Sequence, residues 1–208
     1  MFVKLIKFII KFLNYIIPMS VNNKEEKAKE EESPQKPSND AQNLSESEEN
    51  LRYESEHSYD KISVSKRKST KYIIVHCSDS TWGNAEEIHK WHVERGFNKI
   101  GYHFVILNGK EKSKQSYTES RNGIIETGRE INEIGSHAYG YNSTSIGICL
   151  IGKTQFTEKQ FSVLRKLIKS LQKDFDIPNE NVIGHYETSK ANGKTCPNFD
   201  MVEFRKTL

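Results

Sequence analysis

Two histidines and one cysteine, far apart in the chain, each lie where a side chain of that type can bind a metal ion. His76 ends the apolar, β-branched run Tyr72 to Val75, which predicts a buried strand that delivers its last side chain to the carboxyl edge of a sheet. His185 follows a second short apolar run in the same way, and Cys196 lies in a loop constrained by glycine and Pro197. Imidazole and thiolate are ligands of zinc, so these residues predict one Zn²⁺ site.

The wide spacing of the three residues favours a catalytic zinc site over a structural one. Structural sites usually take four ligands from closely spaced pairs, whereas catalytic sites take three and keep a position for water. Zinc in such a site lowers the pKa of bound water to about 7, which supplies hydroxide near neutral pH. His89 and His92 share one helix face with a metal-like spacing, but they are not needed as ligands. The pattern therefore predicts a zinc hydrolase.

Several motifs extend this prediction to a whole domain. In chain order they are Val75-His76-Cys77-Ser78, Ile88 to Phe104, Gly135 to Ile148, and Lys194-Thr195-Cys196-Pro197. Together they resemble the zinc N-acetylmuramoyl-L-alanine amidases, the family of phage-type amidase lysozymes and peptidoglycan recognition proteins. The resemblance covers roughly Lys71 to Leu208. It implies an α/β fold with a central mixed sheet flanked by helices on both sides, and cleavage of the bond between N-acetylmuramic acid and L-alanine in peptidoglycan or muropeptides.

The resemblance also implies roles for residues that do not bind the metal. Tyr102 and Lys194 match the positions where the family supplies its non-metal catalytic groups. Lys194 would stabilise the developing oxyanion, and Tyr102 would offer its phenol to the attacking water or to the same oxygen. The sequence leaves open which of the two handles the proton. Without the resemblance, a solvated Lys194 and a half-buried Tyr102 are the ordinary alternatives, and His103 is expected to point to the opposite strand face from Tyr102.

Three residues are candidates for binding the substrate. His137 falls where relatives line the substrate groove, and it either contacts sugar or peptide or holds its loop by a hydrogen bond. Asn142 is a similar candidate. Arg129 is a candidate for binding a peptide carboxylate through its bidentate fork, with a surface ion pair as the alternative.

Two other functions remain open for the same residues. A binding module of this fold would sense peptidoglycan without cutting it, although such proteins typically lack the metal-ligand cysteine, and Cys196 is present. A cysteine peptidase would use Cys196 or Cys77 as the nucleophile and His185 or His76 as the base. Against it, His76 and Cys77 are strand neighbours that point to opposite faces, and no orienting Asn or Asp is evident.

Hydrophobic periodicity predicts the elements that must position these residues. They are a helix from Asn84 to Gly96, a strand from His103 to Leu107 before an Asn-Gly turn, a strand from Ser145 to Ile151, and a helix from Thr157 to Phe175. Thr157 and Gln160 form the capping box of the second helix, and Trp91 is expected in the core. The segment between Gly109 and Gly128, rich in Lys, Ser and Glu, is expected to be a loop. Strands mixed with helices predict a layered α/β or α+β fold.

Composition divides the 208 residues into three parts. Residues 1–20 are an apolar and basic N-terminal helix, and residues 1–19 are expected to contact a membrane as an interfacial helix, export signal or anchor. Packing of this helix on the domain is the alternative. Residues 21–69 are an acidic disordered linker, since residues 21–60 carry twelve Asp or Glu and five Lys or Arg. Residues 70–208 are the zinc amidase domain, expected to be exported or membrane-associated and to face the cell wall.

Charge and cysteine content bear on other classes of protein. The net charge of +3 is too small to indicate a nucleic-acid partner, and no helix-turn-helix or zinc-finger spacing is found. Three cysteines without paired spacing give no disulfide framework, so a bridge between Cys77 and Cys149 is not expected. The short basic run Lys66-Arg67-Lys68 ahead of the domain is expected to be solvated.

Overall fold

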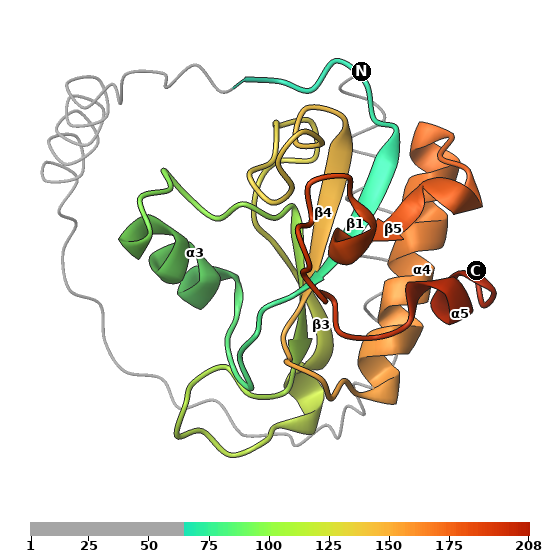
Figure 1. Ribbon diagram of the computed structural model, residues 1–208. Helices are drawn as coiled ribbons and strands as arrows, with labels where there is room; N and C mark the ends of the chain where they lie inside the picture. The colour runs from blue at the N-terminus through green and yellow to red at the C-terminus, as the bar shows by residue number, and fades with distance from the viewer. Residues whose placement is uncertain (1–64) are drawn as a thin grey trace, which may run out of the picture. The chain divides into compact units, whose positions relative to one another are not determined.

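A five-stranded mixed sheet forms the centre of the domain in the computed structural model, which describes residues 65–208 (Figure 1). Its strands are β1 (Tyr72–Cys77), β2 (Phe104–Asn108), β3 (Asn122–Thr127), β4 (Ser145–Leu150) and β5 (Val182–Gly184), in the spatial order β3-β2-β4-β1-β5. Neighbouring strands are parallel except at the edge, where β3 pairs antiparallel with β2. The predicted mixed sheet is confirmed. The helix predicted for residues 1–20 and the linker up to residue 64 lie outside the described residues.

Helices cover both faces of this sheet, as Figure 1 shows. The helix α3 (Ala85–Glu94) lies on one face, and α4 (Glu158–Phe175) and α5 (Met201–Arg205) lie on the other. Short 3₁₀ turns span Glu119–Arg121, Asn179–Asn181 and His185–Glu187. Asn84 caps α3 by accepting the backbone N–H of Glu87, and Thr157 with Gln160 forms the predicted capping box of α4. Local capping chemistry therefore sets where both long helices begin.

Alternating strand side chains pack on both faces of the sheet, and this alternation orients the first candidate ligand. On the α3 face, Ile88 packs with Val105, Leu107 and Cys149, all at most 2% exposed. In the parallel pairing of β1 with β4, His76 lies opposite Cys149, so both side chains point to the α3 face. His76 therefore emerges at the carboxyl end of β1, between the sheet and the elements on that face.

The strand β3 falls in the segment that the sequence pattern indicates as a loop. It begins with Asn122 and Gly123, which are both poor strand formers, and it pairs with β2 alone. A side chain at Gly123 would collide with Lys159 of α4, so the absence of one lets this edge strand lie against the helix. Pairing with β2 and close packing on α4, both non-local, hold a strand that its own residues do not predict.

Arg67 is buried, unlike the exposed lysines on either side of it. Its guanidinium donates to the carbonyl oxygens of Ile131, Glu133 (3.1 Å) and Ser145 (3.0 Å). Burial lowers the pKa of Arg67 to about 10, which leaves it charged at neutral pH. The prediction that the whole basic run is solvated is therefore wrong for Arg67, because three charge-assisted hydrogen bonds offset the cost of its desolvation.

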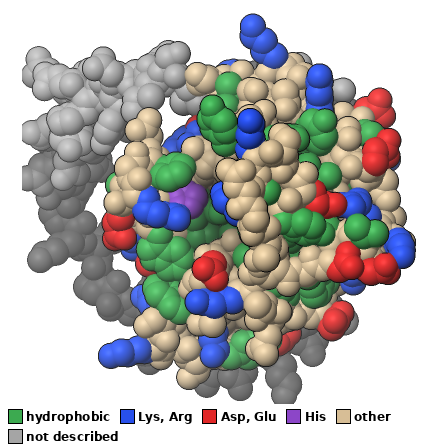
Figure 2. All heavy atoms as spheres, in the orientation of Figure 1, with side chains coloured by type: hydrophobic (Ala, Val, Ile, Leu, Met, Phe, Trp, Pro, Cys, Tyr) green, Lys and Arg blue, Asp and Glu red, His purple; other side chains and the backbone are tan. Residues whose placement is uncertain are grey.

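The described surface carries side chains of both charges. Figure 2 shows Lys and Arg scattered among acidic and apolar side chains over one face. Within residues 65–208, no helix is both long and apolar enough to cross a membrane.

Replacing Arg67 with Ala should lower the free energy of unfolding by about 3 kcal/mol, because three carbonyl groups lose a charged donor. Lys68→Ala is the matched control and should change stability by less than about 0.5 kcal/mol, since this neighbour is exposed. Urea denaturation of both variants, followed by circular dichroism, measures the difference. Equal stability of the two variants would show that the carbonyl contacts of Arg67 contribute nothing.

Candidate functional site

His76, His185 and Cys196 come together at the carboxyl ends of β1 and β5. Their candidate ligand atoms, one ring nitrogen from each histidine and Sγ of Cys196, all lie within 4.8 Å of one another. Nδ1 of His76 lies 3.8 Å from Sγ of Cys196. A tetrahedral zinc ion about 2.0 Å from nitrogen and about 2.3 Å from sulfur separates two such ligands by about 3.6 Å. The arrangement is therefore compatible with zinc, and within residues 65–208 it is the one group of this kind.

The loop that carries Cys196 packs directly on the end of β5. A Cβ atom at Gly184 would lie 2.9 Å from Pro197, so only glycine allows this approach. The backbone N–H of Tyr186 donates to the carbonyl of Cys196 (2.9 Å), and the backbone N–H of Cys77 donates to Sγ of Cys196 (3.3 Å). Cys196 is thus held from two sides, with its sulfur turned toward His76.

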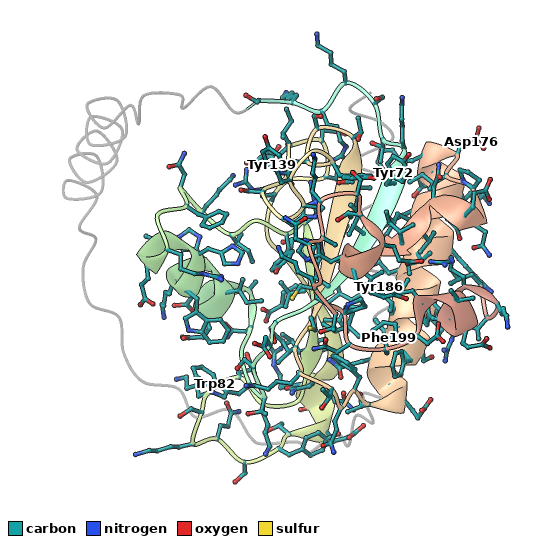
Figure 3. The ribbon with its side chains drawn as sticks, in the orientation of Figure 1. Tyr72, Trp82, Tyr139, Asp176, Tyr186 and Phe199 are labelled. Carbon is teal, nitrogen blue, oxygen red and sulfur yellow. The ribbon has the colours of Figure 1, made fainter. Side chains whose placement is uncertain are left out.

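Aromatic packing anchors the chain immediately after this loop. The ring of Phe199 packs edge-on against Phe161 of α4, with centroids 5.1 Å apart, and also contacts Phe156 and Phe204. Figure 3 shows Phe199 and Tyr186 on the side of the sheet that α4 and α5 cover. Because these rings bury apolar area on a rigid helix, they fix the position of the residues just before them.

Burial sets the charge state of the three candidate ligands. Burial, then the charges of neighbouring histidines and Lys194, lower the pKa of His76 well below its ordinary value. Burial and the charge of Lys194 lower the pKa of His185 to about 4. Both imidazoles are therefore neutral near pH 7, which is the form that binds metal. A hydrogen bond with the Cys77 thiol and burial raise the pKa of the Cys196 thiol, a preference that a coordinated dication reverses.

Tyr102 and Lys194 both lie close to the candidate ligands. The ring of Tyr102 lies 5.1 Å from that of His76 and 5.3 Å from that of His92, centroid to centroid. Burial raises the pKa of the Tyr102 phenol well above its ordinary value. Lys194 is exposed, and its charge acts on both His76 and His185. The Tyr102 ring thus lies beside one candidate ligand, and Lys194 lies two residues before another, while their catalytic roles remain predictions.

The substrate-binding candidates His137 and Asn142 both take part in a loop beside the ligands. Nδ1 of His137 lies 3.0 Å from Nε2 of His76. Oδ1 of Asn142 accepts the backbone N–H groups of His137 and Ala138, both at 2.8 Å. The Asn142 side chain thus holds the loop that carries His137. A contact of either residue with substrate remains a prediction.

Arg129 is engaged in an ion pair. Its Nη1 lies 2.9 Å from Oε1 of Glu133, and its Nε donates to the carbonyl of Ile100 at 2.8 Å. The Arg129 side chain is 12% exposed, so this pair is more buried than the surface pair considered from the sequence. The structure therefore supports the ion-pair alternative, and binding of a peptide carboxylate remains a prediction.

Buried histidines near the site carry structural hydrogen bonds that the sequence did not indicate. Nδ1 of His103 accepts the N–H of Gly147 (3.0 Å), and Nδ1 of His92 accepts the N–H of Gly101 (2.9 Å). The prediction that Tyr102 and His103 point to opposite faces stays a prediction: the ring of Tyr102 meets His76 and His92, and that of His103 bonds Gly147, while both lie near His137 with centroids 6.3 and 5.8 Å away.

Asn198 is a further supporting residue that the sequence analysis did not single out. Its Nδ2 donates to Sγ of Cys77 (3.4 Å) and to the carbonyl of Lys153 (2.7 Å). Asn198 has a φ of 67°, a left-handed conformation that Asn tolerates better than most residues. The sequence signal for this role was an Asn directly after Cys196-Pro197.

All three cysteines, including Cys77 and Cys149, are free thiols.

Comparison with known proteins shows the family to which this chain belongs. Residues 66–199 match the sequence model of the family described as N-acetylmuramoyl-L-alanine amidase. An endolysin of Enterobacteria phage K11 is 34% identical over 159 residues, which are 71% of this chain and 93% of the phage protein. The N-acetylmuramoyl-L-alanine amidase LysC from Clostridium intestinale is similar in structure with a TM-score of 0.57 at 26% identity, covering 69% of this chain and 88% of LysC. Drosophila PGRP-LB is also similar in structure, with a TM-score of 0.50 at 30% identity, covering 65% of this chain and 79% of PGRP-LB. The matched segment contains every candidate ligand.

The zinc-free protein should lose stability as the pH falls from about 6.5 to about 4.5. Burial lowers the pKa of His103 to about 3 and that of His92 to about 4. Below the ordinary histidine pKa of about 6.5, these histidines are therefore protonated in the unfolded chain but stay neutral in the folded protein, so acid favours unfolding. This pH window lies above the range where carboxylates titrate. Urea denaturation at several pH values with a chelator present measures the effect.

The variant His103→Asn keeps an acceptor for Gly147 and should show a shallower pH dependence in that window, by up to about 1.4 kcal/mol per pH unit. An unchanged slope would mean that His103 titrates normally in the folded protein.

Proposed function

The chain belongs to the N-acetylmuramoyl-L-alanine amidase family, and from this premise we propose that it is a zinc-dependent hydrolase of peptidoglycan. The bond cleaved is the amide between N-acetylmuramic acid and L-alanine. The convergence of His76, His185 and Cys196 within 4.8 Å carries the zinc part of this proposal. Peptidoglycan as the substrate means that the catalytic domain works on the wall side.

The three ligands fit a zinc ion by chemistry as well as by distance. His76 and His185 are neutral imidazoles, and the N–H of Cys77 supports negative charge on the sulfur of Cys196. Three protein ligands rather than four are the pattern of a catalytic site. When bound there, zinc supplies Lewis acidity that activates water and polarises a carbonyl group.

Tyr102 and Lys194 supply the groups that act on the amide itself. The ammonium of Lys194, on the exposed loop just before Cys196, stabilises negative charge that develops on the amide oxygen. The phenol of Tyr102, beside His76, orients the attacking water or donates to that same oxygen.

A cysteine nucleophile is the competing mechanism, because Cys196 lies close to His76. A catalytic cysteine needs a histidine that a third group orients for proton transfer, commonly a carboxylate or amide. In the described part of the chain, the second ring nitrogen of His76 meets His137 instead. His185 converges on the same point, which a metal requires and a Cys-His pair does not.

Mass spectrometry of peptidoglycan fragments tests the proposed reaction. Incubation with the zinc-loaded protein should release free stem peptides that begin with L-alanine, and chelation should stop their release. Inhibition by thiol alkylation with no effect of chelation would favour the cysteine nucleophile. Intact muropeptides despite bound zinc would favour a binding module.

The substitution Cys196→Ser should abolish stoichiometric zinc binding and activity while leaving the fold largely intact, because one of three ligands is lost. Ser162→Ala is the control, since Ser162 lies on α4, which covers the opposite face of the sheet from the His76 side chain, and this variant should keep both zinc and activity. Metal analysis of the purified proteins and the fragment assay are the measurements. An active, metal-free Cys196→Ser protein would refute the zinc mechanism.

The substitution Lys194→Ala should lower kcat by about 100-fold with little change in zinc content, because a donor to the developing oxyanion is removed. Lys190→Ala is the control, since Lys190 is exposed on the same loop. Steady-state kinetics on soluble muropeptides compares the two. Equal activities of the two variants would show that Lys194 is an ordinary solvated lysine.

A further inference from the structure

A chain of polar contacts leads away from the ring nitrogen of His76 that does not face Cys196. Nε2 of His76 lies 3.0 Å from Nδ1 of His137. Nε2 of His137 lies 3.4 Å from Oγ of Ser145, and this Oγ lies 2.8 Å from the carbonyl oxygen of Tyr141. We infer that each hydrogen bond in this series is donated in the same direction, from His76 toward Tyr141. His137 is then a positioning residue that holds His76 in the tautomer with an unprotonated Nδ1.

The direction follows from the far end of the chain. A carbonyl oxygen only accepts hydrogen bonds, so the single proton of the Ser145 hydroxyl goes to Tyr141. The hydroxyl oxygen must then accept from Nε2 of His137, which therefore carries a proton. Neutral His137 has its lone pair on Nδ1, and this nitrogen accepts from Nε2 of His76. The proton of His76 is thus on Nε2.

The opposite direction fails at the serine. If Nδ1 of His137 donated to His76, Nε2 of His137 would carry the lone pair and would need a proton from Ser145. The one hydroxyl proton would then have to serve both His137 and Tyr141. Only the first direction gives every group in the chain a partner of the right kind.

The ring of His137 is held in a slot that fits it closely. A Cβ atom at Gly147 would lie 2.6 Å from this ring, so the ring lies directly over the backbone of β4. Gly135 on the loop leaves as little space, since a Cβ atom there would lie 2.5 Å from the same ring. Asn142 fixes the backbone of His137 as well. The ring therefore has one orientation in which to meet His76.

This inference rests on the proposed zinc site for its functional meaning. The unprotonated Nδ1 of His76 is the atom that lies 3.8 Å from Sγ of Cys196, so it is the atom that faces the metal position. The ring of His185 packs on that of His76, with centroids 4.5 Å apart. The far ring nitrogen of His76 has a hydrogen-bond partner in His137, so the protein orients this imidazole before any metal binds. A group that bonds the far nitrogen of a ligand histidine typically changes metal affinity by about 10- to 100-fold.

Nitrogen-15 NMR of the zinc-free full-length protein tests the tautomers directly. Long-range correlations between ring nitrogens and ring carbon-bound protons, assigned with His76→Asn and His137→Asn, should show Nε2–H on both residues. A proton on Nδ1 of either residue would overturn the inference. This outcome is independent of zinc and of activity, so it distinguishes failure of the inference from failure of the proposed function.

Two substitutions at His137 then test its effect on the metal. His137→Asn retains an acceptor near the position of Nδ1, whereas His137→Phe fills the slot without one. Competition with a chromogenic chelator should show zinc affinity weakened by about 10- to 100-fold in the Phe variant and kept within about threefold of wild type in the Asn variant. Thermal unfolding with a chelator present checks that both fold. Equal zinc affinities of two folded variants would refute a positioning role while leaving the zinc site in place.

Discussion

The parallel pairing of β1 with β5 is the interaction on which the site depends. Val75 lies opposite Gly184 in this pairing, so the residues that follow these two in the chain, His76 and His185, lie side by side. Their ring centroids are 4.5 Å apart although more than a hundred residues separate them in the chain. A slip of one residue would turn the His76 side chain to the other face of the sheet. The backbone ladder thus aligns two ligands before any metal binds.

Close approach of backbone and side chains completes the site around these two histidines. Gly184 admits the loop that delivers Cys196, and Gly147 admits the ring that meets His76. Neither glycine is needed for a turn at these positions. Each leaves room for a neighbour that a methyl group would displace. The absence of a side chain at these two positions therefore helps to fix the geometry of the site.

Burial of neutral imidazoles gives the site its electrical character. His76, His92 and His103 all have lowered pKa values because burial penalises the charged ring. The fixed positive charges near them have separate tasks: Arg67 bonds backbone carbonyl groups, and Lys194 stays at the surface. A dication therefore meets lone pairs rather than protons at this place.

The sequence by itself determined the features that depend on local pattern: the buried strands β1, β4 and β5, the capped helices α3 and α4, and the identity of the residues that converge. The tertiary structure alone decided the strand β3, the burial of Arg67, the ion pair of Arg129, and the contact of His137 with His76. Periodicity and capping act between residues a few positions apart, so the sequence shows them directly. Hydrogen bonds between distant segments depend on strand order and register, which emerge only when the whole domain packs.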